Sequence, residues 1–256
     1  MPTDPIQLQY PVVLIHGLGA KGQYGPVDYF YGLPKMLRDA GNRILIADLT
    51  AFHLIEHRAR ELKEQIERAI PDGKVNLIGH SFGGLDARFL SSNAQFSERV
   101  ASVTTIGTPN RGSILADVAL GLMPDVTFNI ADRLLSLIKS SSRAYHQITH
   151  RYVNEVFAHQ AANSPNVSYF SATSVIRDPV VKTALPVFWI PHRIIKRYEG
   201  DNDGFVSAHS ASWGEHIATY VGDHYGQIGH FLGYSRGLDY LKFYGEILTK
   251  LKARGF

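Results

Sequence analysis

One pentapeptide constrains the fold of this 256-residue chain more than any other feature. Residues 74–78 (KVNLI) form a short apolar run that is typical of a strand buried on both faces. The sequence GHSFG at 79–83 follows directly, and a helix is predicted over 85–92. Small residues two positions either side of Ser81 permit a very tight bend that raises the serine hydroxyl above the sheet. This pattern predicts a catalytic serine, and a glycine-rich turn that happens to contain serine is the alternative.

Strand and helix patterns alternate along the rest of the chain. Further apolar runs predict strands at 11–15, 43–48, 100–106 and 166–172. Helical patterns lie between them at 29–40 and 58–70, and a leucine stripe at 238–251 predicts a long C-terminal helix. This order predicts an α/β fold with a mostly parallel central sheet and helices on both faces. Because there is no repeat or linker, a single domain over 1–256 is predicted.

Composition excludes several classes of protein. Hydrophobic residues make up 45% of the chain and charged residues 19%, which is ordinary for a globular protein and too apolar for a disordered one. The absence of cysteine excludes disulfides, thiolate metal sites and cysteine nucleophiles. A net charge of +3 with interspersed signs gives no reason to expect a nucleic-acid partner.

The sequence predicts no transmembrane segment, because no apolar window is long enough to cross a bilayer. Residues 1–10 are polar and do not have the pattern of a signal peptide. Either the protein is not exported by such a signal or the signal has been removed, so the localisation stays open.

A serine nucleophile needs a base, and the base needs an acid to orient it. In sheets of this kind the chain order is serine, acid, histidine. The glycine-flanked cluster GDNDGFV at 200–206 supplies the preferred acid, Asp203, with Asp201 as the alternative. Two histidines near the C-terminus compete for the role of base, His224 and His230, and the local sequence leaves both open.

The oxyanion of a tetrahedral intermediate needs hydrogen-bond donors. One predicted donor is the backbone N–H of Phe82, the residue after the nucleophile. The other is the backbone N–H of Leu18, in the loop HGLG at 16–19 that follows the first strand. Glycine in this loop lets the backbone approach the substrate closely.

Two stretches break the alternation, and we expect them to form a movable cover and the wall of an apolar pocket. The first, 114–150, is predicted to be a small helical lid inserted in the domain; the second, 174–198, is apolar, aromatic and then basic. Phe188 and Trp189 are predicted to contact substrate. Three basic residues are expected to face anionic headgroups during transient contact with a lipid interface: Arg193, Lys196 and Arg197. Irregular packing around the core is the alternative.

Two rival functions follow from other features. His53, Glu56 and His57 fit the pattern H-x-x-E-H, in which two histidines bind zinc and the glutamate acts as base. Solvent-facing polar residues at a helix start are the simpler interpretation. A catalytically silent binding protein on the same fold is the second rival.

With these residues in place, the chain resembles the bacterial triacylglycerol lipases of the pseudomonad type. The stretches that carry the resemblance are YPVVLIHGLG at 10–19, DYFYGL at 28–33, KVNLIGHSFGGL at 74–85, VASVTTIGTPNRGS at 100–113 and NDGFV at 202–206. The resemblance implies an α/β-hydrolase fold and ester hydrolysis through an acyl-enzyme. The segment DHYGQIGH at 223–230 matches the family motif NHLDEINQ, which implies that His224 is the catalytic histidine. The substrate is expected to be an acylglycerol or, alternatively, a short-chain soluble ester.

The chain also departs from this family. The larger members have a disulfide and a structural calcium, which is bound partly by a carboxylate two residues after the histidine. Here that position is Gly226, so a calcium site of the family's type is not expected, and no cofactor is required. The chain is also shorter between Ser113 and Asp203, which implies a small lid.

Overall fold

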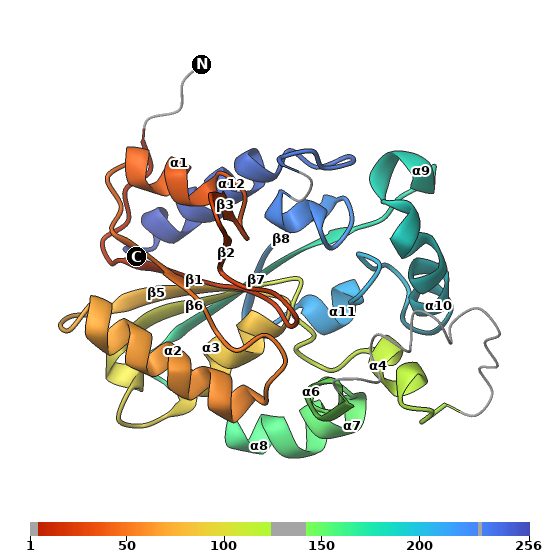
Figure 1. Cartoon of the computed structure of the whole chain (residues 1–256), viewed down its shortest axis with the longest axis horizontal. Helices are drawn as coiled ribbons and strands as arrows, with labels where there is room; N and C mark the ends of the chain where they lie inside the picture. Colours follow the sequence, from red (N-terminus) through yellow and green to blue (C-terminus); the bar gives the residue numbers. More distant parts are fainter. Residues whose placement is uncertain (1–4, 124–141, 230–231) are drawn as a thin grey trace.

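A computed structural model describes residues 5–123, 142–229 and 232–256 of the chain. A six-stranded sheet with the order β4-β1-β5-β6-β7-β8 lies at its centre, and every pair of neighbouring strands is parallel (Figure 1). The strands are β1 (Val12–Ile15), β4 (Ile44–Ala47), β5 (Val75–His80), β6 (Val100–Ile106), β7 (Ser168–Val175) and β8 (Glu215–Val221). The predicted fold class is confirmed.

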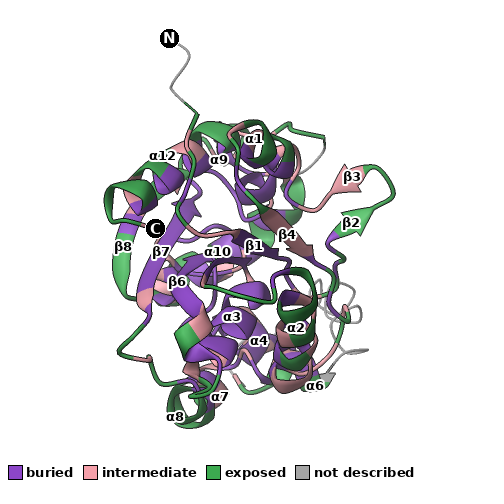
Figure 2. Ribbon diagram, turned by 90° about the vertical axis from the view of Figure 1, so that its left-hand side faces the viewer, coloured by how far each residue is buried: buried purple, intermediate pink, exposed green. Residues whose placement is uncertain are grey.

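Helices cover both faces of this sheet. On one face lie α1 (Leu33–Asp39) and α12 (Tyr240–Ala253), and on the other lie α2 (Ile55–Ala69) and α3 (Phe82–Ser92) (Figure 1). Alternate residues of β1 enter the two cores, since Val12 and Leu14 pack with α1 and α12 while Val13 and Ile15 pack with α2 and α3. Figure 2 shows the result: β6 and β7 are buried between the helices, whereas the edge strand β8 is largely exposed.

Two parts of the sheet differ from the prediction. The edge strand β8 was missed because only one of its seven residues is buried, so its sequence contains no continuous apolar run. A small hairpin of β2 (Gln23–Tyr24) and β3 (Val27–Asp28) precedes α1. The helix predicted at 29–40 begins only at Leu33, because Gly32 takes a left-handed conformation with φ 72° and Pro34 follows in the first turn.

A group of short helices lies beyond the carboxyl ends of the strands, and we call its described segments 113–123, 142–152 and 179–199 the cover. They contain α4 (Ile114–Ala119), α6 (Ser142–His146), α7 (His150–Tyr152), α9 (Val180–Thr183) and α10 (Trp189–Glu199). A π-helical turn over Val153–Phe157 leads from α7 to α8 (Ala158–Gln160), and α11 (Ala208–Ala211) precedes β8. The predicted lid at 114–150 is described only at 114–123 and 142–150, so it stays a prediction.

In the described part of the chain no helix is both long and apolar enough to cross a bilayer.

Candidate active site

Ser81 occupies the sharp turn between β5 and α3. Its backbone has φ 56° and ψ −127°, a conformation that non-glycine residues seldom adopt. The bend brings neighbouring backbone very close: a Cβ atom on Gly79 would lie 2.4 Å from the carbonyl oxygen of Gly83, and one on Gly83 would lie 2.4 Å from that of Ile15. Both glycines are therefore needed for the turn that lifts Ser81.

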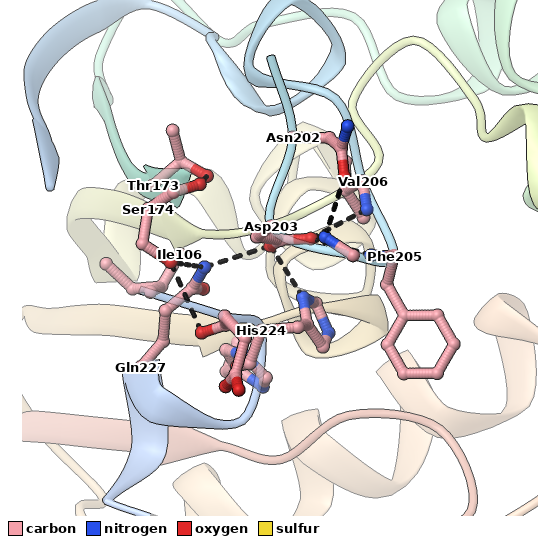
Figure 3. A network of polar contacts seen from close by, with 12 residues as sticks. Ile106, Thr173, Ser174, Asn202, Asp203, Phe205, Val206, His224 and Gln227 are labelled. Carbon is pink, nitrogen blue, oxygen red and sulfur yellow. Dashed lines mark hydrogen bonds and ion pairs between the residues drawn. The ribbon is translucent and has the colours of Figure 1, made fainter. Parts of the chain in front are cut away.

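Asp203 and His224 come from different loops and meet through a buried hydrogen bond. Asp203 lies between α10 and α11, and His224 follows β8. The ring Nδ1 of His224 is 2.7 Å from Asp203 Oδ2, and the His224 main-chain N–H donates to the Asp203 carbonyl oxygen over 2.8 Å (Figure 3). A carboxylate only accepts, so Nδ1 holds the proton and Nε2 is free to accept one.

Three further donors fix the Asp203 carboxylate. Oδ1 accepts the main-chain N–H groups of Phe205 and Val206 at 2.9 and 2.8 Å, and Oδ2 accepts Nε2 of Gln227 at 2.9 Å (Figure 3). The alternative acid, Asp201, is instead a surface residue that pairs with Arg177 and Lys196. Of the two candidates, only Asp203 touches the histidine.

Ser81 and His224 both line one apolar pocket of about 290 Å³. No hydrogen bond joins their side chains in the described structure, and catalytic contacts of this kind are often long before substrate binds. His230, the competing base, lies outside the described residues. The structure thus brings Asp203 to His224, and His224 and Ser81 to the same cavity.

Both predicted oxyanion donors belong to residues on this pocket, Leu18 and Phe82. Phe82 is the first residue of α3, where N–H groups have no acceptor within the helix. The loop of Leu18 is held by His16, whose Nδ1 is 2.8 Å from the Gly17 carbonyl oxygen and whose Nε2 accepts the Leu49 N–H at 2.9 Å. Burial, reinforced by Arg58, lowers the pKa of His16 to about 4, so this ring is neutral at pH 7.

A buried ion pair between α2 and α3 supports the loop of Leu18. Arg58 Nη2 is 2.8 Å from Asp86 Oδ2, and both side chains are fully buried between α2 and α3. The same guanidinium donates to the carbonyl oxygens of His16 and Thr50, both at 2.9 Å. Burial raises the pKa of Asp86 to about 6 against the opposing effect of Arg58. The pair therefore fastens the Leu18 loop to the two helices beneath it.

Comparison with known proteins supports the same fold. The family model described as the alpha/beta hydrolase fold matches residues 10–131. The chain has the α/β hydrolase fold. A triacylglycerol lipase of Pseudomonas fragi is 26% identical over 98% of this chain and 99% of its own length. Triacylglycerol lipase 2 of Saccharomyces cerevisiae is 29% identical over 90% of this chain and 75% of its own length. The resemblance to triacylglycerol lipases is confirmed.

Solved structures support the same fold. A Bacillus licheniformis lipase in its mature form superposes with a TM-score of 0.71 at 20% identity, covering 97% of this chain and 93% of its own. The lipase of Staphylococcus hyicus gives a TM-score of 0.70 at 17% identity, over 99% and 98% of the two chains. At these identities the likeness shows the architecture of the hydrolase and no more.

The pocket of this hydrolase is walled by the cover. Apolar side chains reach it from α4 (Leu115, Val118), from the turn before α7 (Ile148) and from the segment of α10 (Val187, Ile190). The expected contacts Phe188 and Trp189 are not part of this lining. Phe188 is fully buried behind the wall, packed against the rings of Phe205 and Tyr225, whereas Trp189 is on the outer surface.

The H-x-x-E-H pattern has a structural role in this hydrolase. Glu56 accepts hydrogen bonds from Gln147 Nε2 at 2.9 Å and from the Tyr152 hydroxyl at 3.2 Å, and the rings of His53 and His57 stack on each other. Across residues 5–123, 142–229 and 232–256, no three histidine or carboxylate side chains converge as a metal site. Glu56 therefore ties the start of α2 to the cover.

Two polar residues of the active-site loop were missed in the sequence. Gln227 donates to both Asp203 and the Ser174 hydroxyl, and its position three residues after His224 was the available signal. Asp223 is buried, and its carboxylate accepts the N–H groups of Leu185 and Gly226, both at 2.7 Å. Burial raises the pKa of Asp223. Asp223 thus links the histidine loop to Leu185, directly before the wall residue Pro186.

Proposed function

We propose that this hydrolase cleaves the carboxylic ester bonds of acylglycerols through an acyl-enzyme formed on Ser81. One observation carries the proposal: the pair of His224 and Asp203 reaches the same apolar pocket as a serine held in a strained turn. The triacylglycerol lipases to which the chain is similar support the choice of substrate.

In the first half of the reaction, Nε2 of His224 takes the hydroxyl proton of Ser81 as Oγ bonds to the ester carbonyl carbon. The carbonyl oxygen becomes an oxyanion that accepts hydrogen bonds from the N–H groups of Leu18 and Phe82. The intermediate then expels the alkoxide, which receives the proton from His224 and leaves as the alcohol. Asp203 holds the ring in the required tautomer throughout.

In the second half, His224 takes a proton from water while the water oxygen attacks the acyl carbon. The bond to Ser81 Oγ breaks, the proton returns to the serine, and the carboxylic acid is released. The chain supplies nucleophile, base and acid from its own residues, so the proposal includes no cofactor. A chelator should leave the turnover of a soluble ester unchanged; loss of activity that added Ca²⁺ or Zn²⁺ restores would contradict this.

Lipid contact is the second element of the proposal. Several apolar side chains are exposed near the pocket, on α10 and on the turn before it. Among them are Val187, Trp189 and Ile190. The basic residues Arg193, Lys196 and Arg197 are exposed on the same helix. Such a surface suits transient contact with an oil–water interface that carries anionic lipid.

A carboxylesterase that prefers short soluble esters is the second candidate. The pocket volume of about 290 Å³ favours it, since pockets for drug-sized ligands begin near this size. The two candidates share the mechanism and differ in the acyl chain that they accept.

A chain-length profile separates the two candidates. The initial rates on soluble esters from acetate to decanoate and on emulsified triolein are compared, with Ser81→Ala as the blank. A lipase should favour the longer acyl groups and hydrolyse triolein; activity that falls steadily after butyrate and is absent on triolein identifies the esterase. Failure of a fluorophosphonate probe to label the wild-type protein, while Ser81→Ala behaves identically, would overturn both.

A further inference from the structure

His150 lies between two carboxylates that are not part of the active site. Its Nδ1 is 2.5 Å from Asp117 Oδ2, and its Nε2 is 3.2 Å from Glu199 Oε1. Carboxylates only accept hydrogen bonds, so both ring nitrogens must donate, which only the imidazolium form can do. The two carboxylates meet opposite nitrogens of the ring, so the arrangement is an ion triplet rather than a chelate for a metal.

The three members of this triplet come from the three segments of the cover that wall the pocket. Asp117 lies on α4, His150 begins α7, and Glu199 ends α10, and α4 packs directly on α10 (Figure 1). The same segments present apolar side chains to the pocket, for example Val118 and Ile190. One charged contact therefore joins all three walls.

Further hydrogen bonds converge on the same point. Glu199 Oε1 accepts the main-chain N–H of Ile114 at 3.0 Å, at the first turn of α4. The Ser113 N–H donates to the Ile148 carbonyl oxygen at 2.9 Å, and the Ser113 hydroxyl donates to that of Phe205 at 3.0 Å. Since Phe205 is two residues from Asp203, the walls are also joined to the loop of the predicted catalytic acid.

Other nearby charges are paired elsewhere. Arg151, next in the chain, pairs with Glu155, and Lys196, one turn before Glu199, pairs with Asp201. The charged groups that face His150 in the described structure are thus the two carboxylates. Its hydrogen bonds to Asp117 and then to Glu199 raise the pKa of His150 to about 9. The imidazolium that makes both contacts therefore predominates until the pH approaches 9. Its contribution to stability is complete below pH 6.5 and is lost as the pH rises through about 9.

We infer that His150 is a positioning residue that aligns the three walls of the pocket and thereby determines the affinity for long acyl chains. This inference rests on the proposed ester hydrolysis. A short acyl group would occupy only the space next to Ser81, whereas a longer one would extend along the walls from α4, the turn before α7 and the segment of α10. Misalignment of these walls should therefore weaken binding of long chains without changing the reaction of short ones.

The test compares His150→Gln with wild type on soluble butyrate and octanoate esters at pH 7.5. Glutamine offers one donor amide and carries no charge, so it cannot hold both carboxylates. We expect KM for octanoate to rise about tenfold, with kcat on both esters and KM for butyrate within twofold of wild type. His159→Gln, the same change at an exposed histidine of α8, should leave all four values unchanged. Glu199→Gln breaks the same contact if His150→Gln does not fold.

A pH series tests the charge itself. The ratio of octanoate to butyrate kcat/KM in wild type should fall between pH 8 and 9.5, and butyrate serves as the internal reference for the chemistry. His150→Arg keeps a cation at this position at every pH, so its ratio should stay high and flat across the range.

Three outcomes overturn the inference: an octanoate KM unchanged by His150→Gln, an equal loss on both esters, or a ratio that declines equally in His150→Arg. If the wild-type protein hydrolyses no ester and a fluorophosphonate does not label it, the proposed function is wrong, and the inference fails with it. A normal wild-type profile that His150→Gln leaves intact rejects the inference alone.

Discussion

The pocket lies between the loops at the end of the sheet, which we call the sheet side, and the cover, which we call the cover side. Different kinds of contact stabilise these two sides. On the sheet side, the Asp203 carboxylate is fully buried and four N–H donors satisfy it, two of them from the backbone of its own loop. On the cover side, one backbone hydrogen bond from Ser113 to Ile148 is supplemented by side-chain charges around a half-buried His150. The contacts of a fully buried carboxylate are screened little by salt, whereas a half-exposed charged contact depends on pH and salt. Buried contacts thus hold the sheet side, where the proposed chemistry needs fixed atomic positions. Partly exposed charges hold the cover side, which would contact the variable part of the substrate.

The largest expected effect is the loss of turnover when a predicted catalytic residue on the sheet side is replaced. Ser81→Ala removes the nucleophile and His224→Ala removes the base, and each should reduce kcat by about a million-fold, as in other serine triads. Ser81→Ala removes one hydroxyl and should leave the melting temperature within a few degrees. His224→Ala removes a buried ring and a partner of the buried Asp203 carboxylate, so it should lower the melting temperature. Ester hydrolysis and thermal unfolding of the purified variants measure both effects.

The control for the base is His230→Ala, at the competing histidine, which should retain most activity. If His230→Ala is inactive and His224→Ala is active, the base has been assigned to the wrong residue while the mechanism stands.

The orienting acid should contribute about two orders of magnitude less than the nucleophile. Asp203→Asn keeps the shape of the side chain but no longer favours the tautomer with the proton on Nδ1, which costs about 10⁴-fold in kcat in related triads. Asp201→Asn is the matched control, because Asp201 makes only exposed ion pairs with Arg177 and Lys196. Equal losses in the two variants would mean that the pair of Asp203 and His224 does not carry the chemistry.

Stability should differ between the two sides as well. Asp86→Ala leaves the buried guanidinium of Arg58 without a counter-charge beneath the Leu18 loop, which should cost about 3–5 kcal/mol in the free energy of unfolding. Lys35→Ala breaks an exposed pair with Asp39 and should cost no more than about 1 kcal/mol. Urea denaturation measures both, and a loss below about 1 kcal/mol for Asp86→Ala would contradict the supporting role of the buried pair.

Low pH should lower the free energy of unfolding through the protonation of His16, on the sheet side. The pKa of His16 is about 4 in the folded protein and 6.5 in an ordinary histidine, so the unfolded chain takes up the proton first as the pH falls. This group's contribution is complete above pH 6.5 and is lost towards pH 4, which amounts to about 3 kcal/mol. The difference in unfolding free energy between wild type and His16→Gln isolates this contribution from other titrating groups, such as Asp86. A difference that does not change between pH 7 and 4 would show that His16 is not held neutral by burial.

The sheet side could be predicted from the sequence better than the cover side, because its features lie in short continuous segments. The Ser81 turn, the Leu18 loop and the parallel strands depend on short segments in which buried strands and glycines are visible directly. Asp203 could be chosen as the candidate acid because its loop is flanked by glycine, and the structure places its carboxylate against His224. The contacts of Asp117 with His150 and of Glu56 with Gln147 join residues 33 and 91 positions apart, and no local pattern marks them. The pocket wall was predicted in the correct segment but at different residues, because aromatic side chains suggested contact where Phe188 serves as core.

The smallest expected effect separates the wall of the pocket from its outer surface. Ile190 lines the pocket and Trp189 does not, although the two are adjacent and similarly exposed, at 46% and 37%. Ile190→Ala removes part of the apolar wall and should raise KM for a soluble octanoate ester about fivefold, which corresponds to about 1 kcal/mol, with little change for butyrate. Trp189→Ala should leave both values unchanged and lower only the rate on emulsified triolein, where the outer surface meets lipid. If Trp189→Ala instead raises KM for the soluble ester while Ile190→Ala does not, the acyl chain binds along the outer face of α10. The pocket beside Ser81 would then be too small to be the acyl site.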